Sequence, residues 1–169
     1  NVAARVGFDR DKVLFRLGQC YQSLGQQQQS QDPASQEAMK SIDKGLESYR
    51  QLIDEYPKSS LLADALFSAG ISSQMKKDSA AAKVFYQRLV DGYPQHPAAP
   101  NAVLQLARLH YEAGELNEAR DLYLSALTKY PDSELKDQAH MELALAYKKL
   151  GDLDAAIHSL ETIDSAWPQ

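Results

Sequence analysis

An aromatic residue followed by proline occurs four times in this chain, at a constant spacing of 37 residues. The pairs are Tyr56-Pro57, Tyr93-Pro94, Tyr130-Pro131 and Trp167-Pro168. Proline lacks a backbone N–H and disfavours helical geometry in the residue before it, so each pair predicts the end of a helix. A fixed period of this length indicates a repeat architecture, in which small structural units stack on their neighbours.

Several other positions recur with the same period. When the three later segments are aligned on the aromatic-proline pair, four positions match: a small one (Gly70, Ala107, Ala144), an acid (Asp78, Glu115, Asp152), an alanine (Ala82, Ala119, Ala156) and a large apolar one (Tyr86, Tyr123, Leu160). A small residue lets two helices approach closely. Gly114 and Gly151 precede the acid and predict left-handed caps at helix ends. The acid favours the positive end of the next helix, so each unit is predicted to be helix–turn–helix.

The first unit is longer than the others. The distance from Gly25 to Tyr56 is 31 residues, whereas the equivalent distance from Gly114 to Tyr130 is 16. The first part of this 15-residue insertion is rich in glutamine and serine and contains Asp32-Pro33, which predicts a flexible loop near 26–35. Its second part, from about Ser35, predicts an extension of the following helix. We therefore expect one all-α array over 1–169, with repeats at about 9–57, 58–94, 95–131 and 132–168.

This pattern of small, aromatic, glycine-acid, alanine and proline positions resembles the tetratricopeptide repeat over residues 9–168. The resemblance implies a right-handed superhelical solenoid of four helix pairs, about eight helices, whose first helices line a concave face. The usual unit has 34 residues, and the three extra residues here follow the proline. Segments such as Tyr56-Pro57 before a serine and an alanine-rich helix are similar to those of two bacterial envelope families. These are the Tol–Pal-associated cell-division coordinator and the outer-membrane assembly lipoprotein of the β-barrel machinery.

The match to these two families is incomplete. The first family has a tryptophan in its opening helix, where Leu104 and Met141 stand or lie nearby. The second has a lipidation-type N-terminus, which this sequence lacks. The resemblance therefore implies the repeat class and a location in the periplasm or cell envelope, near the outer membrane, with the cytoplasm as the alternative.

First-helix positions that packing does not use are expected to face a partner. They predict a groove composed of Phe15, Gln19, Phe67, Ile71, Gln74, Leu104, Arg108, Tyr111, Met141, Leu145 and Lys148. One position is apolar in every repeat (Phe15, Phe67, Leu104, Met141), which favours an apolar ridge for an extended segment or an amphipathic helix. Arg108, Lys148 and Lys149 favour acidic groups at its C-terminal end. The alternative is that these side chains pack on a neighbouring helix or are covered by another part of the parent protein.

The remaining residues do not assemble the usual marks of catalysis or metal binding. The net charge is -5 and no lysine or arginine run occurs, which argues against nucleic acid or an anionic membrane as the main partner. No apolar stretch approaches the ~20 residues that span a bilayer. The four histidines lack the HExxH arrangement, and Cys20 is predicted to be a small buried residue. We expect no catalytic residue, cofactor or metal, and hence no enzyme.

Two functions follow from the sequence. The first is a non-catalytic protein–protein interaction scaffold that binds a peptide or helix in the concave groove, as a fragment of a larger bacterial envelope protein. The alternative is a structural spacer or a self-association module in a longer repeat protein. The last predicted helix favours this alternative, because it carries Ala156, Ile157, Leu160 and Ile163 with no polar cap after them.

Overall fold

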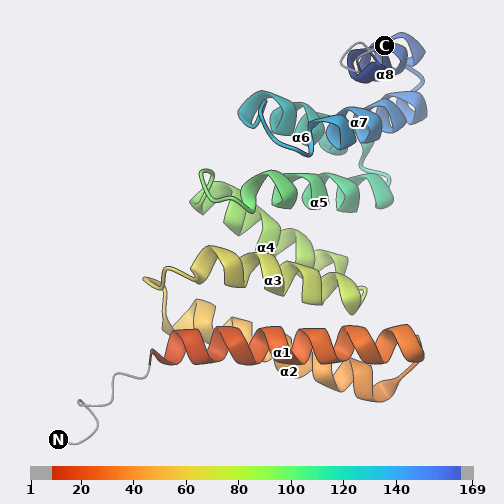
Figure 1. Cartoon of the computed structure of the whole chain (residues 1–169). Helices are drawn as coiled ribbons and strands as arrows, with labels where there is room; N and C mark the ends of the chain where they lie inside the picture. The colour runs from red at the N-terminus through yellow and green to blue at the C-terminus, as the bar shows by residue number, and fades with distance from the viewer. Residues whose placement is uncertain (1–8, 165–169) are drawn as a thin grey trace, which may run out of the picture. The chain divides into compact units, whose positions relative to one another are not determined.

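The computed structural model describes residues 9–164, and this part of the chain is all-α. Its eight helices are α1 (Arg10–Gln31), α2 (Gln36–Glu55), α3 (Leu62–Met75), α4 (Ser79–Gly92), α5 (Ala99–Glu112), α6 (Leu116–Lys129), α7 (Lys136–Leu150) and α8 (Leu153–Asp164) (Figure 1). They confirm the predicted all-α repeat fold of helix pairs. By contact the chain divides into two compact units, Asn1–Leu89 and Val90–Gln169, and the division falls inside α4. Trp167-Pro168 lies outside the described residues.

In the first unit, α1 and α2 pack side by side as a long helical hairpin, and α3 packs on α2. The small positions make the close approach: a Cβ atom added to Gly18 would lie 2.4 Å from the Tyr49 ring. The Tyr49 side chain is fully buried and its hydroxyl donates a hydrogen bond to Gln22 Oε1 at 2.8 Å. A buried aromatic residue therefore fills the space that glycine leaves, and the small residue allows the close approach that the repeat pattern predicts.

The insertion in the first repeat is helical rather than a loop. Helix α1 continues through 26–31, and only 32–35 connect it to α2, so the prediction of a flexible loop near 26–35 is wrong for most of its length. Glutamine is a good helix former, and the added turns pack on α2, where Ser41 Oγ donates to Gln28 Oε1 at 2.8 Å. The predicted extension of the second helix is confirmed, because Ser35 caps α2 by accepting from the Ala38 N–H.

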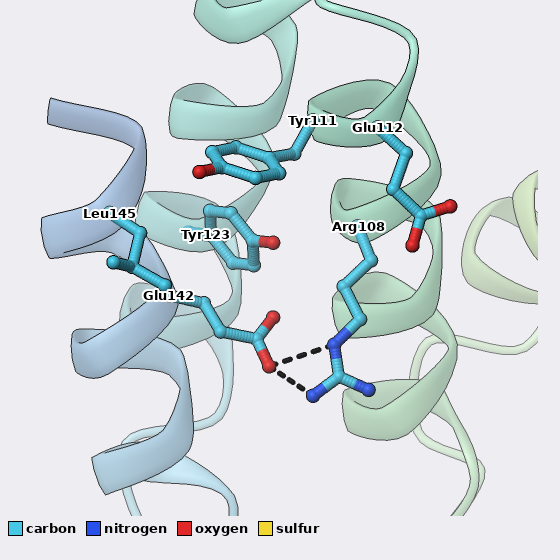
Figure 2. Close-up of a pocket in the computed structure, with 6 residues that line it drawn as sticks. All are labelled: Arg108, Tyr111, Glu112, Tyr123, Glu142 and Leu145. Atoms are coloured by element: carbon cyan, nitrogen blue, oxygen red, sulfur yellow. Dashed lines mark hydrogen bonds and ion pairs between the residues drawn. The ribbon is translucent and has the colours of Figure 1, made fainter. Parts of the chain in front are cut away.

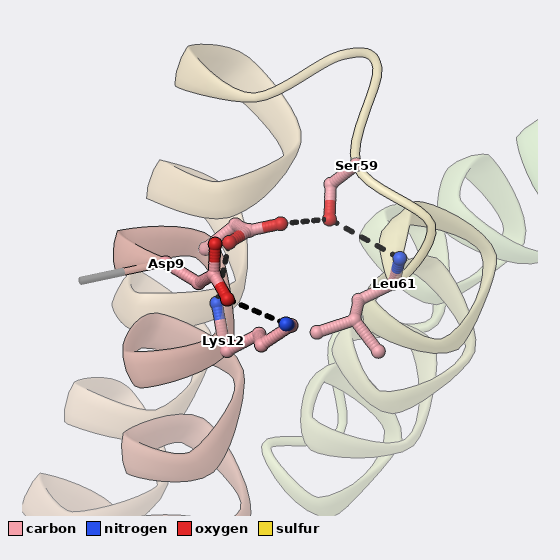
Figure 3. Close-up of polar contacts among 5 residues, drawn as sticks. Asp9, Lys12, Ser59 and Leu61 are labelled. Atoms are coloured by element: carbon pink, nitrogen blue, oxygen red, sulfur yellow. Dashed lines mark hydrogen bonds and ion pairs between the residues drawn. The ribbon is translucent and has the colours of Figure 1, made fainter. Parts of the chain in front are cut away.

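The start of α1 is tied to the loop between α2 and α3 (Figure 3). Ser59 Oγ donates to Asp11 Oδ2 at 2.6 Å and accepts from the Leu61 N–H at 3.1 Å. The hydrogen bond from Ser59 lowers the pKa of the Asp11 carboxyl below its ordinary value. Lys12 Nζ donates to Asp9 Oδ2 at 2.5 Å one turn away. These bonds fix where the first helix begins relative to the turn that follows Tyr56-Pro57.

In the second unit, α5 to α8 pack successively, α6 on α5, α7 on α6 and α8 on α7. Gly114 and Gly151 have φ values of +80° and +86°, which confirms the predicted left-handed caps. In the first unit, Lys77 takes the equivalent position, 37 residues before Gly114, and its φ is 61° although it is not a glycine. The Tyr130 hydroxyl donates to the Pro94 carbonyl oxygen at 3.0 Å, so consecutive Tyr-Pro turns are linked directly.

Candidate protein interaction site

The eleven residues predicted to line a groove differ widely in exposure. Phe15 and Leu104 are buried; Gln19, Phe67, Ile71, Gln74, Arg108 and Tyr111 are half-buried; Met141, Leu145 and Lys148 are exposed. Those up to Gln74 belong to the first unit, and those from Leu104 onward belong to the second. The second unit brings Arg108, Tyr111 and Leu145 together around one cavity.

The apolar ridge predicted along the first helices is not continuously exposed. The Phe15 and Phe67 rings pack against Tyr49 and Tyr86, with ring centroids 5.9 Å and 5.8 Å apart. Leu104 is 2% exposed and lines a small void with Ala126 of α6 and Ala139 of α7. The prediction that Phe15 and Leu104 face a partner is wrong, because this position packs inside the helix pair and beneath the next helix. Met141, in the last pair, remains 52% exposed.

Other predicted groove residues already have partners within the first unit. Gln74 Oε1 accepts a hydrogen bond from the Tyr86 hydroxyl at 2.5 Å. Gln22 does the same for Tyr49 one repeat earlier. Gln19 Oε1 accepts from Arg16 at 2.9 Å on the same helix. These amides support the buried tyrosines, so their first role is in packing.

A cavity of about 250 Å³ lies between α5 and α7 (Figure 2). It is lined by Arg108, Tyr111 and Glu112 of α5, Tyr123 of α6, and Glu142 and Leu145 of α7. Tyr111 occupies the position that Gln22 and Gln74 hold in the first two repeats. Its ring forms a wall above Tyr123 in place of an amide bonded to the buried tyrosine. Glu112 and Leu145 are exposed, so the cavity is open to solvent at their edge.

An ion pair forms one side of the cavity. Arg108 Nε donates to Glu142 Oε1 at 2.8 Å, Arg108 Nη2 donates to the same oxygen, and Gln138 Nε2 does so at 3.0 Å. The hydrogen bond to Glu142 raises the pKa of the Arg108 guanidinium above its ordinary value. Because Glu142 already balances this charge, the expectation that Arg108 attracts an acidic partner is not supported by its surroundings.

The aromatic floor of the cavity stays uncharged. Burial, and after it the negative charge of Glu142, raises the pKa of the Tyr123 hydroxyl well above its ordinary value. The Tyr123 hydroxyl faces the Glu142 carboxylate (Figure 2). At the rim, Lys149 Nζ lies 4.1 Å from the centroid of the Tyr111 ring, a cation–π contact that places a positive charge beside the opening.

Two residues that line the cavity, Tyr123 and Glu142, are not among those that the sequence predicts for the concave face. The sequence shows Tyr123 only as a recurring large apolar position, and in the structure it is 1% exposed. Glu142 lies 34 residues after Arg108, so their pairing connects the first helices of consecutive repeats. The sequence does contain a signal for this pair, because Arg108 and Glu142 carry opposite charges and lie almost one repeat period apart on helices expected to be neighbours.

Cys20 is exposed, so the prediction of a buried cysteine is wrong; its equivalents Ser72, Leu109 and Ala146 are buried. Within residues 9–164, no three histidine, cysteine or acidic side chains gather where they could hold a metal ion. Over the same range, no helix combines the length and apolar character that crossing a bilayer requires.

Helix pairs that repeat every 37 residues, with a small residue opposite a buried aromatic one and a proline after the second helix, define a helical repeat protein. The sequence model of the tetratricopeptide repeat-like domain matches residues 45–167, and the chain belongs to that family. Domains of this kind are typically scaffolds for protein–protein interaction. A search of curated proteins found no match.

Solved structures with the same fold share little sequence with this chain. One MamA structure has a TM-score of 0.61 and 20% identity, over 81% of each chain. A second MamA structure has a TM-score of 0.61 and 18% identity, over 90% of this chain and 89% of the other. The TPR-like repeats of a protein described as a kinesin light chain of Podosopora anserina give a TM-score of 0.70 and 18% identity, over 89% of this chain and 74% of the other. At these identities the likeness concerns the fold alone.

Proposed function

We propose that the chain is a non-catalytic scaffold that holds a segment of a partner protein, anchored in the cavity between α5 and α7. The observation that carries this proposal is the cavity itself, with two tyrosine rings and a leucine in its lining. Its volume of about 250 Å³ lies below the roughly 300–1,000 Å³ of small-molecule sites. One large side chain of a protein partner suits it better than a cofactor does.

The charges near the opening favour a particular kind of partner. Arg108 is neutralised by Glu142, but Lys148 and Lys149 lie at the C-terminal end of α7, and Lys149 lies over the Tyr111 ring. The C-terminal end of a helix carries a partial negative charge, so the positive charge near this opening comes from the two lysine side chains. The partner segment should therefore present one large apolar side chain, with an acidic residue directed to Lys148 and Lys149 and away from the exposed Glu112 at the same opening. It would bind in an extended or a helical conformation.

A displayed library of random peptides, selected on the folded chain, tests this proposal. Enriched peptides should carry an aromatic or large aliphatic residue next to aspartate or glutamate. Tyr111→Ala should weaken them at least about tenfold, as expected for an aromatic wall at the centre of an interface. The control is Leu124→Ala, which truncates an exposed leucine of α6 outside the cavity. Peptides that bind Tyr111→Ala as tightly as the unchanged chain would show that this cavity is not the site.

We also propose the periplasm or cell envelope of a bacterium as the setting, as part of a larger protein. The support is the similarity of the Tyr-Pro repeats to those of the two envelope families, and the cytoplasm is the alternative. Fractionation of cells that express the full-length parent protein tests the location. A role as a structural spacer or self-association module is the second candidate function, and it is favoured by exposed apolar residues on α1 and α8.

A further inference from the structure

Helix α1 has an apolar face that is buried on its counterparts in later repeats. On α3, which packs on α2, this face consists of Ala65, Ala69 and Ser72, and all three are buried. On α7, which packs on α6, the matching residues Ala139, Leu143 and Ala146 are buried as well. On α1 the same positions are Val13, Leu17 and Cys20. Val13 and Leu17 are 42% and 44% exposed, and Cys20 is exposed too.

These α1 residues, together with exposed Leu24, form what we call the N-terminal face. Their spacing of four, three and four residues keeps all of them on one side of the helix. Three exposed large apolar residues in a row on one helix are more than the scattered exposure expected of a monomer surface. On α3 and on α7, this face is covered by the second helix of the preceding pair, which is α2 for α3 and α6 for α7.

The last described helix pair, α7–α8, exposes the complementary surface. In the pair α5–α6, Leu104 and Tyr123 are only 2% and 1% exposed, and α7 packs on this pair. The residues 37 positions later, Met141 and Leu160, are 52% and 48% exposed. No helix within residues 9–164 packs on α7–α8 as α7 packs on α5–α6. Met141 and Leu160, with the exposed Leu153 and Ile157 of α8, form what we call the C-terminal face.

We propose that the chain self-associates head to tail, with the N-terminal face of one copy packed on the C-terminal face of a second. The contact would repeat the one that α7 makes with α5–α6, because α1 offers Val13, Leu17 and Cys20 where α7 offers Ala139, Leu143 and Ala146. A second copy satisfies both faces at once, since each face presents the half of the interface that the other lacks. Such a contact is heterologous and extends to chains of copies unless the geometry closes.

The charges of the helices involved support this occupant. Helix α1 carries three basic residues and one acidic residue. Helices α7 and α8, which supply the C-terminal face, together carry five acidic residues and three lysines. The helices that supply the two faces therefore carry net charges of opposite sign, and added salt should weaken the contact by screening.

Sedimentation velocity over a concentration range of about 10 μM to 1 mM, which spans weak to moderate affinities, tests the proposal. The unchanged chain should rise in weight-average mass with concentration. Leu17→Glu and Ile157→Glu change exposed positions, so each should keep the circular dichroism spectrum of the unchanged chain and should stay monomeric over this range. Leu124→Glu, an equal change at a leucine of α6 that is 39% exposed and belongs to neither face, should associate as the unchanged chain does.

The decisive sample is an equimolar mixture of Leu17→Glu and Ile157→Glu. Each variant retains the face that the other has lost, so the mixture should form one-to-one dimers and nothing larger. A mixture that stays monomeric overturns head-to-tail pairing even if the unchanged chain associates, and an unchanged chain that remains monomeric at 1 mM overturns self-association altogether. In either case the faces would be left for another helix, of the parent protein or of a different one.

Cys20 offers a second readout because it lies within the N-terminal face. Its reaction with a thiol reagent should slow at least about tenfold between the lowest and highest concentrations for the unchanged chain, in proportion to the copies whose face is covered. In Ile157→Glu the rate should not depend on concentration. Tyr111→Ala should associate normally, and Leu17→Glu should still bind selected peptides, so failure here is separable from failure of the proposed cavity. A Cys20 rate independent of concentration in the unchanged chain contradicts the proposal.

Discussion

Gly70 provides the sharpest test of how the helix pairs pack. A Cβ atom at this position would lie 2.4 Å, 2.7 Å and 2.8 Å from three atoms of the Tyr86 ring. The ring has little freedom to move, because Tyr86 is fully buried and its hydroxyl donates to Gln74 Oε1 at 2.5 Å. The Phe67 ring also lies against it, with centroids 5.8 Å apart. Gly70→Ala should therefore force α3 and α4 apart locally.

The expected magnitude is a difference of two opposing effects. Replacing glycine by alanine inside a helix gains about 1 kcal/mol of helix propensity. Inserting a methyl group into a well-packed site costs about 1–3 kcal/mol. The free energy of unfolding of Gly70→Ala should therefore fall by about 1 kcal/mol. For a chain of this length that corresponds to a loss of about 2–4 °C in the unfolding temperature.

Thermal unfolding followed by circular dichroism measures this change. Gly92→Ala is the matched control, because a Cβ atom there has no neighbour within 4 Å, and it should not lower the unfolding temperature. Gly70→Ala combined with Tyr86→Leu should lose less than the two changes added together, since Ala144 and Leu160 already make that pairing in the last repeat. If Gly70→Ala stabilises the chain as much as an unhindered glycine replacement does, the close-packing argument is wrong.

Three further predictions follow from single contacts. Lys77→Gly should raise the free energy of unfolding by about 0.5–1 kcal/mol in denaturant melts, because only glycine holds a φ of 61° without strain; no change would contradict this. Arg108→Ala should cost about 1–3 kcal/mol by leaving the Glu142 carboxylate unmatched, and adding Glu142→Gln should restore part of it; an equal or larger loss in the double variant speaks against the pair. Burial raises the pKa of the Tyr49 hydroxyl to about 12, whereas the unfolded side chain ionises near pH ~10. The neutral buried hydroxyl therefore stabilises the fold fully below pH ~10, and this contribution is lost as the pH rises to about 12. The absorbance difference between the unchanged chain and Tyr49→Phe should show this phenolate forming together with loss of helix, and its formation near pH ~10 with the helices intact would refute the argument.

Local signals in the sequence predicted the helix ends well. Tyr56-Pro57, Tyr93-Pro94 and Tyr130-Pro131 mark the ends of second helices, because proline acts on the residue beside it. Gly114 and Gly151 cap first helices because a left-handed φ is a property of one residue. The glutamine-rich insertion was misjudged for the same reason: its composition resembles a loop, but 26–31 extend α1 along α2, and that packing depends on residues elsewhere in the chain.

Exposure could not be predicted from one repeat at a time. Phe15, Leu104 and Met141 occupy the same position, yet only Met141 is exposed, because exposure depends on which helix covers the position. Cys20 shows the same effect in the first helix pair, since its buried equivalents lie under a neighbouring helix. The cavity escaped prediction in part because Glu142 reaches it from the next repeat. The position of its ion pair follows from how consecutive pairs stack.

The most direct test of the proposed function is a titration followed by nuclear magnetic resonance of methyl-labelled leucine and methionine. The titrant is a peptide selected on the folded chain. The account predicts saturable shifts at Leu145, which lines the cavity, and their loss in Tyr111→Ala with the fold intact. Leu124, on α6 outside the cavity, should not shift. Saturable shifts that leave Leu145 unmoved, or that persist unchanged in Tyr111→Ala, would contradict the claim that partners are held between α5 and α7.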